Sequence, residues 1–266
     1  MKIVWRLSIR AQIIIILVNS VIFTILGTYL ALFTSNKVVL PVIQLLAIIP
    51  FFVKNVWDRR LWEASSLVLI WALLVTATFA FLVAQYGCSS GGDDIGDIVY
   101  NGHKYLDEMI KWIQTGKGAE GDPSLFVKPK IIELIVFSMA SLITAGIAGL
   151  AMGAILLNYM NYYYGILIWI TNYNIKAILL GWPIYAILRV PGYIFLGTAL
   201  SSISIELIKN RKIIINEQAI SLLKYAFALI ILDFILKATI ANAIYQPTLN
   251  DIIDPSRLEA CLEILK

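Results

Sequence analysis

Three ionisable residues, Arg189, Asp233 and Lys237, lie within long apolar stretches of the sequence. A charge at membrane depth is costly, so such a residue is paired or lines a polar path. Asp233 and Lys237 are four residues apart, which puts them on one helix face with the acid before the base. That spacing fits either a self-neutralising pair or a proton- or ion-coupled site. Arg189 has no local partner, and the prolines at 183 and 191 predict a bent helix around a buried cation. This cation either pairs with Asp233 or binds an anionic group.

A second polar feature is the segment 171–176, which places Asn172 and Asn174 inside the predicted span 162–181. One interpretation is a broken helix whose irregular turn lines a cavity or is buried in protein, as backbone at membrane depth requires. The other makes the segment a surface loop that follows a shorter span. The two asparagines join the three charges above in a candidate intramembrane polar site.

Membrane-spanning helices must position these residues. Of the 266 residues, 60% are apolar and 14% are charged, whereas about 25% of the residues of a soluble domain are charged. A run of about 18 apolar residues can cross the hydrocarbon core of a bilayer. Such runs recur and predict an all-α bundle of seven transmembrane helices, or six if the fifth does not cross. The predicted spans are 11–33, 38–53, 62–85, 131–157, 162–181, 184–207 and 218–243.

The basic residues between these spans predict the orientation. With seven spans, three basic clusters fall on one side, which is cytoplasmic because basic loops resist translocation. The clusters are Lys2, Arg6 and Arg10; Lys54, Arg59 and Arg60; and Lys209, Arg211 and Lys212. The N-terminus is then cytoplasmic, and the loop 86–130, with seven acidic and five basic residues, is outside.

Four regions follow from these spans. Residues 1–85 hold three N-terminal transmembrane helices, and 86–130 form an extracytoplasmic loop. Residues 131–243 hold four transmembrane helices, of which the fifth span is broken by polar residues, and 244–266 form an extracytoplasmic tail. Within the loop, apolar residues from 100 to 114 recur at helical spacing and predict a short amphipathic helix.

The two cysteines, Cys88 and Cys261, both lie on the outer side in the seven-span arrangement. Disulfides persist outside the cytoplasm, and this one would stabilise the fold by roughly 4–5 kcal/mol because it closes a long loop. The sequence therefore favours a Cys88–Cys261 bridge over two free thiols.

Small residues in the predicted span 131–157 include Gly146, Gly149 and Gly153. Small residues at this spacing let helices approach closely. The three glycines therefore predict a packing face, either within the bundle or between two copies of the chain.

Three stretches of the second half follow one another in a recognisable order: Ala145–Gly153 (AGIAGLAMG), Asn161–Gly165 (NYYYG) and Val190–Gly197 (VPGYIFLG). Over about residues 86–245, this order resembles the SpoIIM-like (DUF95) family of prokaryotic membrane proteins. The sequence departs from the family where a His-Gly and a Glu precede the proline, since Trp182, Pro183 and Arg189 stand in that region. The resemblance implies a non-enzymatic membrane component, such as a channel, a transporter or an assembly scaffold.

We therefore expect a transport or channel-like component of the cytoplasmic membrane with its path near the fifth to seventh spans. The alternative is a non-catalytic scaffold subunit of a larger membrane assembly. No constellation of catalytic or metal-ligating residues is recognisable, so neither an enzyme, a cofactor nor a metal is expected. The expected partners are the lipid bilayer and either further copies of the chain or other membrane subunits, and no basic stripe predicts nucleic acid. The richness in Ile, Lys and Tyr is typical of an archaeal or thermophilic source.

Overall fold

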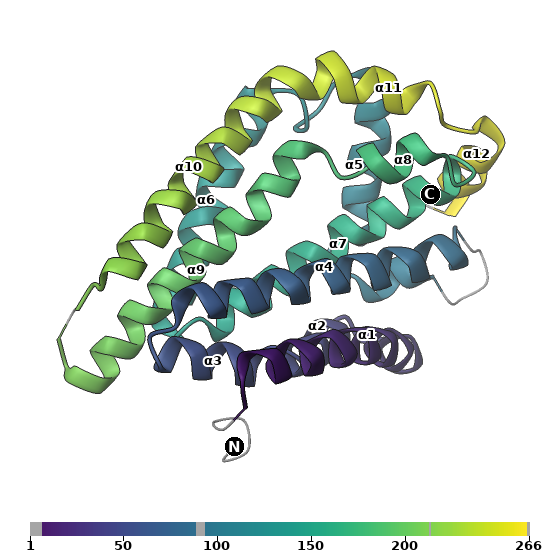
Figure 1. Cartoon of the computed structure of the whole chain (residues 1–266). Helices are drawn as coiled ribbons and strands as arrows, with labels where there is room; N and C mark the ends of the chain where they lie inside the picture. Colours follow the sequence, from purple (N-terminus) through teal and green to yellow (C-terminus); the bar gives the residue numbers. More distant parts are fainter. Residues whose placement is uncertain (1–6, 89–93, 213, 265–266) are drawn as a thin grey trace.

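The computed structural model describes residues 7–88, 94–212 and 214–264, and over these ranges every regular element is helical. Figure 1 shows the helices arranged as a bundle of long rods with shorter helices at one end. The elements in chain order are α1 (Ile9–Thr34), α2 (Val39–Leu46), α3 (Ile49–Trp57), α4 (Leu61–Tyr86), η2 (Ile95–Ile98), α5 (Gly102–Thr115), α6 (Pro123–Ile143), α7 (Ile147–Ile170), α8 (Ile175–Leu180), α9 (Ile184–Asn210), α10 (Glu217–Ile240), η3 (Ala241–Tyr245), α11 (Gln246–Asn250) and α12 (Pro255–Ile264).

Within the described ranges, four helical segments are long and apolar enough to cross a membrane, and the bent pair α2–α3 makes a fifth if it is one span. The four segments are Ile9–Thr34, Leu61–Tyr86, Ile175–Asn210 and Glu217–Asn250. These segments are typical of a multi-pass membrane protein. The predicted count of seven spans is not confirmed, because α6 carries three charged residues and α7 carries four tyrosines and two asparagines.

The helix predicted over 131–157 is wrong, because the chain turns back between α6 and α7. Thr144 ends α6, Ala145 follows with a φ of 51°, and Gly146 has a φ of 91°. The Gly146 N–H donates to the Ser141 carbonyl at 2.8 Å, which is the hydrogen bond that closes a Schellman helix end. The gap predicted between the spans 131–157 and 162–181 does not exist, because α7 continues through it to Ile170.

Helix α7 continues past Asn158, whose side chain forms hydrogen bonds with α2. Asn158 and Gln44 exchange two amide hydrogen bonds, of 2.8 and 3.1 Å, and all of this pair is buried. The Trp71 indole N–H of α4 donates to the backbone carbonyl of Gln44 at 3.1 Å. The predicted single helix over 38–53 is instead the pair α2 and α3, which are bent by 50°.

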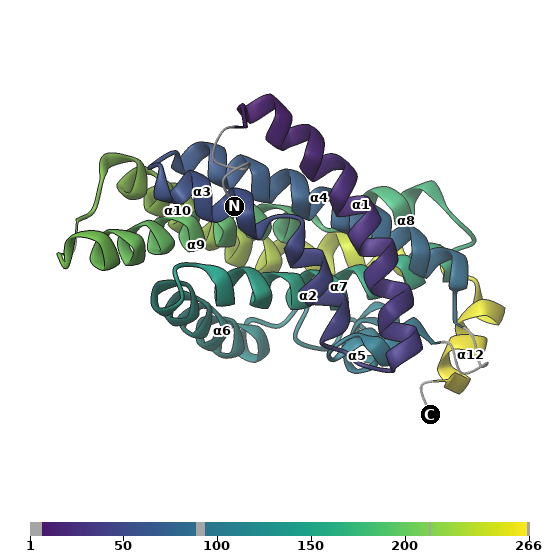
Figure 2. The ribbon, with the colours of Figure 1, turned by 90° about the horizontal axis from the view of Figure 1, so that it is seen from below.

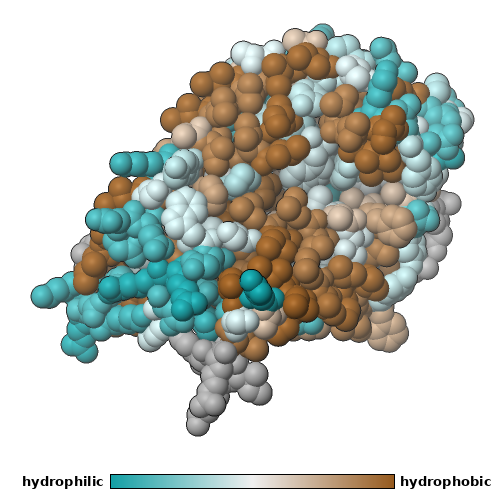
Figure 3. All heavy atoms as spheres, in the orientation of Figure 1, coloured by the Kyte–Doolittle hydropathy of each residue, from teal (hydrophilic) through white to brown (hydrophobic). Residues whose placement is uncertain are grey.

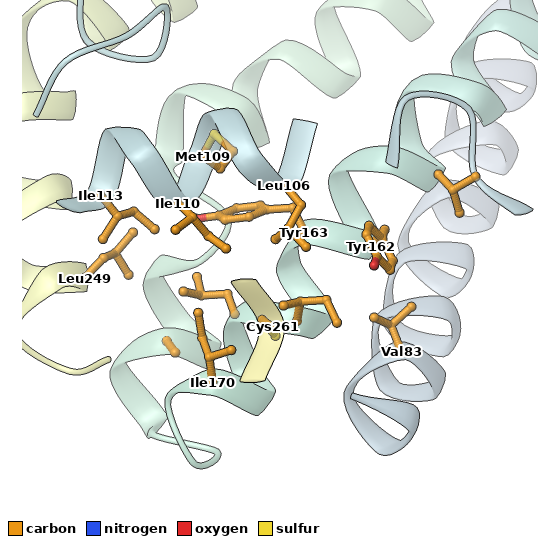
Figure 4. Packing of buried hydrophobic residues seen from close by; sticks show 14 of the residues in the cluster. Val83, Leu106, Met109, Ile110, Ile113, Tyr162, Tyr163, Ile170, Leu249 and Cys261 are labelled. Carbon is orange, nitrogen blue, oxygen red and sulfur yellow. The ribbon is translucent and has the colours of Figure 1, made fainter. Parts of the chain in front are cut away.

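The predicted amphipathic helix of the outer loop is confirmed as α5, and its apolar face is covered by other parts of the chain. Figure 4 shows the α5 side chains directed toward Tyr163 of α7 and Leu249 of α11; those labelled are Leu106, Met109, Ile110 and Ile113. The predicted polar tail 244–266 is largely helical, since it contains α11 and α12. Figure 2 shows α5 and α12 at the same end of the bundle.

Candidate functional site

The side chains of Arg189 and Asp233 form a buried ion pair between α9 and α10. Arg189 Nε donates to Asp233 Oδ2 and Arg189 Nη2 donates to Oδ1, both at 2.9 Å. The two residues are 9% and 1% exposed. The structure therefore contains the Arg189–Asp233 pairing that was one of the two alternatives for Arg189. A bidentate contact of this kind fixes the geometry of both side chains and pairs their charges.

Lys237 makes its ion pair with Glu120, not with Asp233. Its ammonium nitrogen lies 2.8 Å from Glu120 Oε2 and 4.8 Å from the ring centre of Phe126. The predicted self-neutralising pair of Asp233 and Lys237 is therefore not formed, because each has a closer partner from another element. Glu120 belongs to the turn between α5 and α6.

The charge state of Glu120 follows from its surroundings. Burial alone raises the pKa of a carboxyl group, but the Lys237 ammonium and the Arg189 guanidinium outweigh this effect. Together they lower the pKa of Glu120 below its ordinary value of 4.5. Glu120 is therefore ionised at neutral pH, as its contact with Lys237 requires.

A third ion pair lies on α6 and faces the same region. Lys130 donates to both carboxylate oxygens of Glu133, at 2.9 and 2.8 Å, and the Tyr193 hydroxyl of α9 donates to Glu133 Oε1 at 2.9 Å. With the two pairs above, three cations face three anions. Sequence reasoning did not include Lys130, Glu133 or Glu120 in the site, because each lies in or next to a polar loop where a charge is ordinary.

Asn172 and Asn174 do not belong to this site. Asn172 has a φ of 55° in the turn after α7, where the Tyr173 N–H donates to the Ile168 carbonyl at 2.9 Å. Asn174 caps α8, since its side-chain oxygen accepts from the Lys176 N–H at 2.9 Å. The two asparagines therefore end one helix and start the next, and the surface-loop interpretation of 171–176 agrees with the exposure of Asn172 and Tyr173.

An apolar cavity borders the ion pairs, between α4, α6, α7 and α9. The cavity has a volume of about 80 Å³. Lys130, Glu133 and Arg189 line the cavity where α6 and α9 begin, and Phe52 and Thr198 line it farther along the bundle. Nearly all other lining side chains are apolar.

A smaller cavity of about 10 Å³ lies on the other side of Arg189. Tyr105, Glu120 and Pro183 line it, and Arg189 is shared with the larger cavity. Along α9, the smaller cavity touches residues 183–189 and the larger one touches residues 189–198. Arg189 therefore lies where the two cavities meet.

The three glycines predicted to pack helices have different roles. Gly149 lies against Ser141 of α6, so closely that a Cβ atom would collide with the Ser141 hydroxyl. Gly146 makes the turn before α7, next to Ser201 and Phe52. Gly153 has no neighbour within 4 Å of an added Cβ and lines the larger cavity. Gly149 thus packs within the bundle, and Gly153 forms part of the cavity wall.

At the end of the bundle that holds α5 and α12, Cys88 and Cys261 form the predicted disulfide, with their Cα atoms 5.2 Å apart. It fastens α12 next to the end of α4. On α5, His103 Nε2 lies 3.4 Å from Asp94 Oδ2 and 3.3 Å from Asp97 Oδ1. Over the described part of the chain, no group of three or more His, Cys, Asp or Glu residues is arranged to hold a metal ion.

Comparisons with known protein families, with curated proteins and with solved structures returned no match. The resemblance to the SpoIIM-like family therefore stays an expectation from the sequence. Conclusions about function depend on the geometry of the ion pairs and the two cavities.

Proposed function

We propose that this chain is a transport component of a membrane, with a path that runs along α7 and α9 and is interrupted at Arg189. The observation that supports the proposal is the position of Arg189 between two cavities that follow one another along α9. Internal sites between helices, with polar groups in an otherwise apolar wall, are where transporters bind their substrates. Arg189 closes this path, because it lines both cavities where they meet.

The proposed membrane is the cytoplasmic membrane, with the basic end of the bundle inside. Arg59 contacts Glu206 at 2.7 Å, and the Lys209 ammonium donates to the Trp57 carbonyl at 2.6 Å. The basic turn after α3 and the basic end of α9 therefore lie together. On this orientation the larger cavity extends toward the cytoplasm and the smaller one lies on the outer side.

Flux through reconstituted liposomes tests the proposal. We expect the wild-type protein to move at least one solute of a panel of potassium ions, protons and dodecanoate faster than empty liposomes do. Gly153→Leu fills the cavity wall without meeting a neighbour, so it should abolish that flux. Ala77→Leu is the matched control, because it introduces the same side chain at an exposed position of α4.

The alternative of a scaffold subunit predicts a different outcome. If all three solutes cross at the rate of empty liposomes and the protein purifies only with fixed partners, the transport proposal is wrong. The apolar face of α5 argues against a scaffold role, because its residues Leu106, Ile110 and Ile113 are buried by the chain's own helices. The outer region therefore does not present this helix face to a partner.

A further inference from the structure

We infer that the larger cavity binds a single-chain amphiphile with one anionic head group, of which a fatty acid is the simplest member. The head group lies against Arg189, and the alkyl chain runs between α7 and α9 toward Thr198. This inference rests on the proposed function, since it names the substrate class for the same path.

The shape and lining of the cavity fit an alkyl chain. From Arg189 to Thr198 the cavity follows α9 over nine residues, a length of roughly 13 Å at the rise of an α-helix. Trp71, Leu150 and Phe137 are among the side chains that line this length. A hydrated ion gains little from such a wall, whereas an alkyl chain is transferred from water into apolar surroundings.

The α7 wall leaves room for the alkyl chain. Gly149 and Gly153 form part of this wall, and Gly153 leaves open space where a side chain would otherwise stand. The cavity has a volume of about 80 Å³.

The hydrogen-bonding groups still free at the charged end include donors of Arg189. Both Asp233 oxygens accept from Arg189, and both Glu133 oxygens accept from Lys130. Arg189 Nη1, in contrast, has no acceptor among the described residues, although Arg189 is only 9% exposed. A guanidinium has five N–H donors, so this nitrogen leaves two of them for a ligand.

The three ion pairs balance in charge, and two of their cations, Lys130 and Arg189, line the cavity together with one anion, Glu133. A carboxylate head group supplies the acceptors that Arg189 Nη1 lacks, and a charge-assisted hydrogen bond is stronger than a neutral one.

Equilibrium binding to the purified full-length protein in nanodiscs of zwitterionic lipid tests the inference. The probes are radiolabelled dodecanoate, dodecanol and dodecylammonium, which share one chain and differ in the charge of the head group. We expect saturable binding of one dodecanoate per chain and at least about tenfold weaker binding of the other two, because a hydrogen bond to a charged group is lost. Equal binding of all three probes, or no saturable binding of dodecanoate, would overturn the inference.

Variants of the protein test the binding of the alkyl chain and of the head group separately. Gly153→Leu should abolish dodecanoate binding, whereas Ala77→Leu should not change it. The double variant Arg189→Gln with Asp233→Asn removes both charges of the pair together, and we expect it to bind dodecanoate and dodecanol equally. If the double variant still prefers dodecanoate, Arg189 does not hold the head group and the inference is wrong.

The flux and binding measurements test the proposed function and this inference independently. Saturable dodecanoate binding without flux of any solute supports this inference and contradicts the proposed function. Flux of potassium ions or protons without dodecanoate binding supports the proposed function and contradicts the inference.

Discussion

The effect of a single residue of the ion-pair network on stability depends on whether it is changed alone or together with its partner. Asp233→Asn leaves the Arg189 guanidinium buried without a charged partner. We expect the free energy of unfolding to fall by about 3–5 kcal/mol, which is typical when one member of a buried pair is removed. Thermal unfolding in detergent micelles measures the loss. The double variant with Arg189→Gln should recover most of it, and equal losses in the single and double variants would contradict a direct ion pair.

The pH dependence of stability tests Glu120. Burial raises the folded-state pKa of Glu120, but Lys237 and Arg189 outweigh this effect and lower the pKa below 4.5. A lowered carboxyl pKa means that the folded state binds fewer protons than the unfolded state, so the contribution is fully present above pH 4.5 and is lost as the pH falls through the folded-state pKa. The difference in stability between wild type and Glu120→Gln should therefore be constant at neutral pH and shrink in acid. Denaturation curves over this pH range measure it, and a difference that grows in acid would be inconsistent with the pair.

The residues of the candidate site were only partly predictable from sequence. Arg189 and Asp233 were identifiable because a charge in an apolar run is unusual. Glu120 and Lys130 gave no such signal, since each lies in a polar region and is buried only by tertiary packing. Asn172 and Asn174 gave a false signal, because the sequence does not distinguish an asparagine in a turn or helix cap from one that lines a path.

At the scale of the elements, the turn between α6 and α7 explains the largest error in the sequence-based fold. The left-handed position at the end of α6 is held by Ala145 and not by glycine, so the usual sign of a helix end was missing. The long spans α1, α4, α9 and α10 were predicted within a few residues, because their hydrophobic runs are long and end in polar segments. The bend between α2 and α3 has no glycine either, but it directly precedes Pro50 in the first turn of α3, a signal of a helix break that the predicted span 38–53 did not take into account.

This turn makes a specific prediction for Ala145. A left-handed conformation costs an L-residue about 1–2 kcal/mol, and glycine avoids most of this cost. Ala145→Gly should therefore raise the free energy of unfolding by up to about 1 kcal/mol. Gly146→Ala is the contrasting variant, since its φ of 91° and the adjacent Ser201 and Phe52 leave no room for a methyl group. Thermal unfolding compares the two, and a destabilised Ala145→Gly would show that the turn is not as described.

The disulfide controls the attachment of α12. It closes a sequence separation of 173 residues, for which the chain-entropy model gives about 5 kcal/mol. Apart from the disulfide, α12 is held by the Arg257 guanidinium, which donates to the Trp169 carbonyl at 2.8 Å. Without the bridge we expect α12 to detach more often, so trypsin should cleave faster after Arg257. Limited proteolysis of Cys261→Ser checks this, with reduced wild-type protein expected to behave alike. Unchanged cleavage in both samples would mean that packing alone holds α12.

At the scale of the whole molecule, charge and hydrophobicity divide the bundle into ends and sides. Figure 3 shows hydrophilic residues gathered at the end where α9 stops and α10 begins, and hydrophobic residues over the flank of the long helices. Many large apolar side chains on these helices are exposed, among them Leu73, Ile231 and Ile235. An apolar belt between two polar ends is the surface that a bilayer requires. The belt therefore supports the membrane-spanning arrangement independently of the length of any single helix.

The positions of the basic clusters also predict which end faces the cytoplasm. The clusters after α3 and at the end of α9 lie together, and Gln12 near the start of α1 accepts a hydrogen bond of 2.7 Å from Asn55 of α3. The start of α1, with Arg10, is thus at the same end, while Lys2 and Arg6 lie outside the described residues. Because basic segments resist translocation, all of this end should be cytoplasmic.

Labelling of introduced cysteines in intact cells tests this orientation. The two native cysteines are bonded to each other, so Lys212→Cys or Lys117→Cys supplies a single free thiol at an exposed position. We expect a membrane-impermeant maleimide to label Lys117→Cys at once and Lys212→Cys only after the cells are permeabilised. The reverse pattern would invert the orientation. Labelling of both variants in intact cells would place the two ends on one side, which a bundle that crosses the membrane along its long axis does not allow.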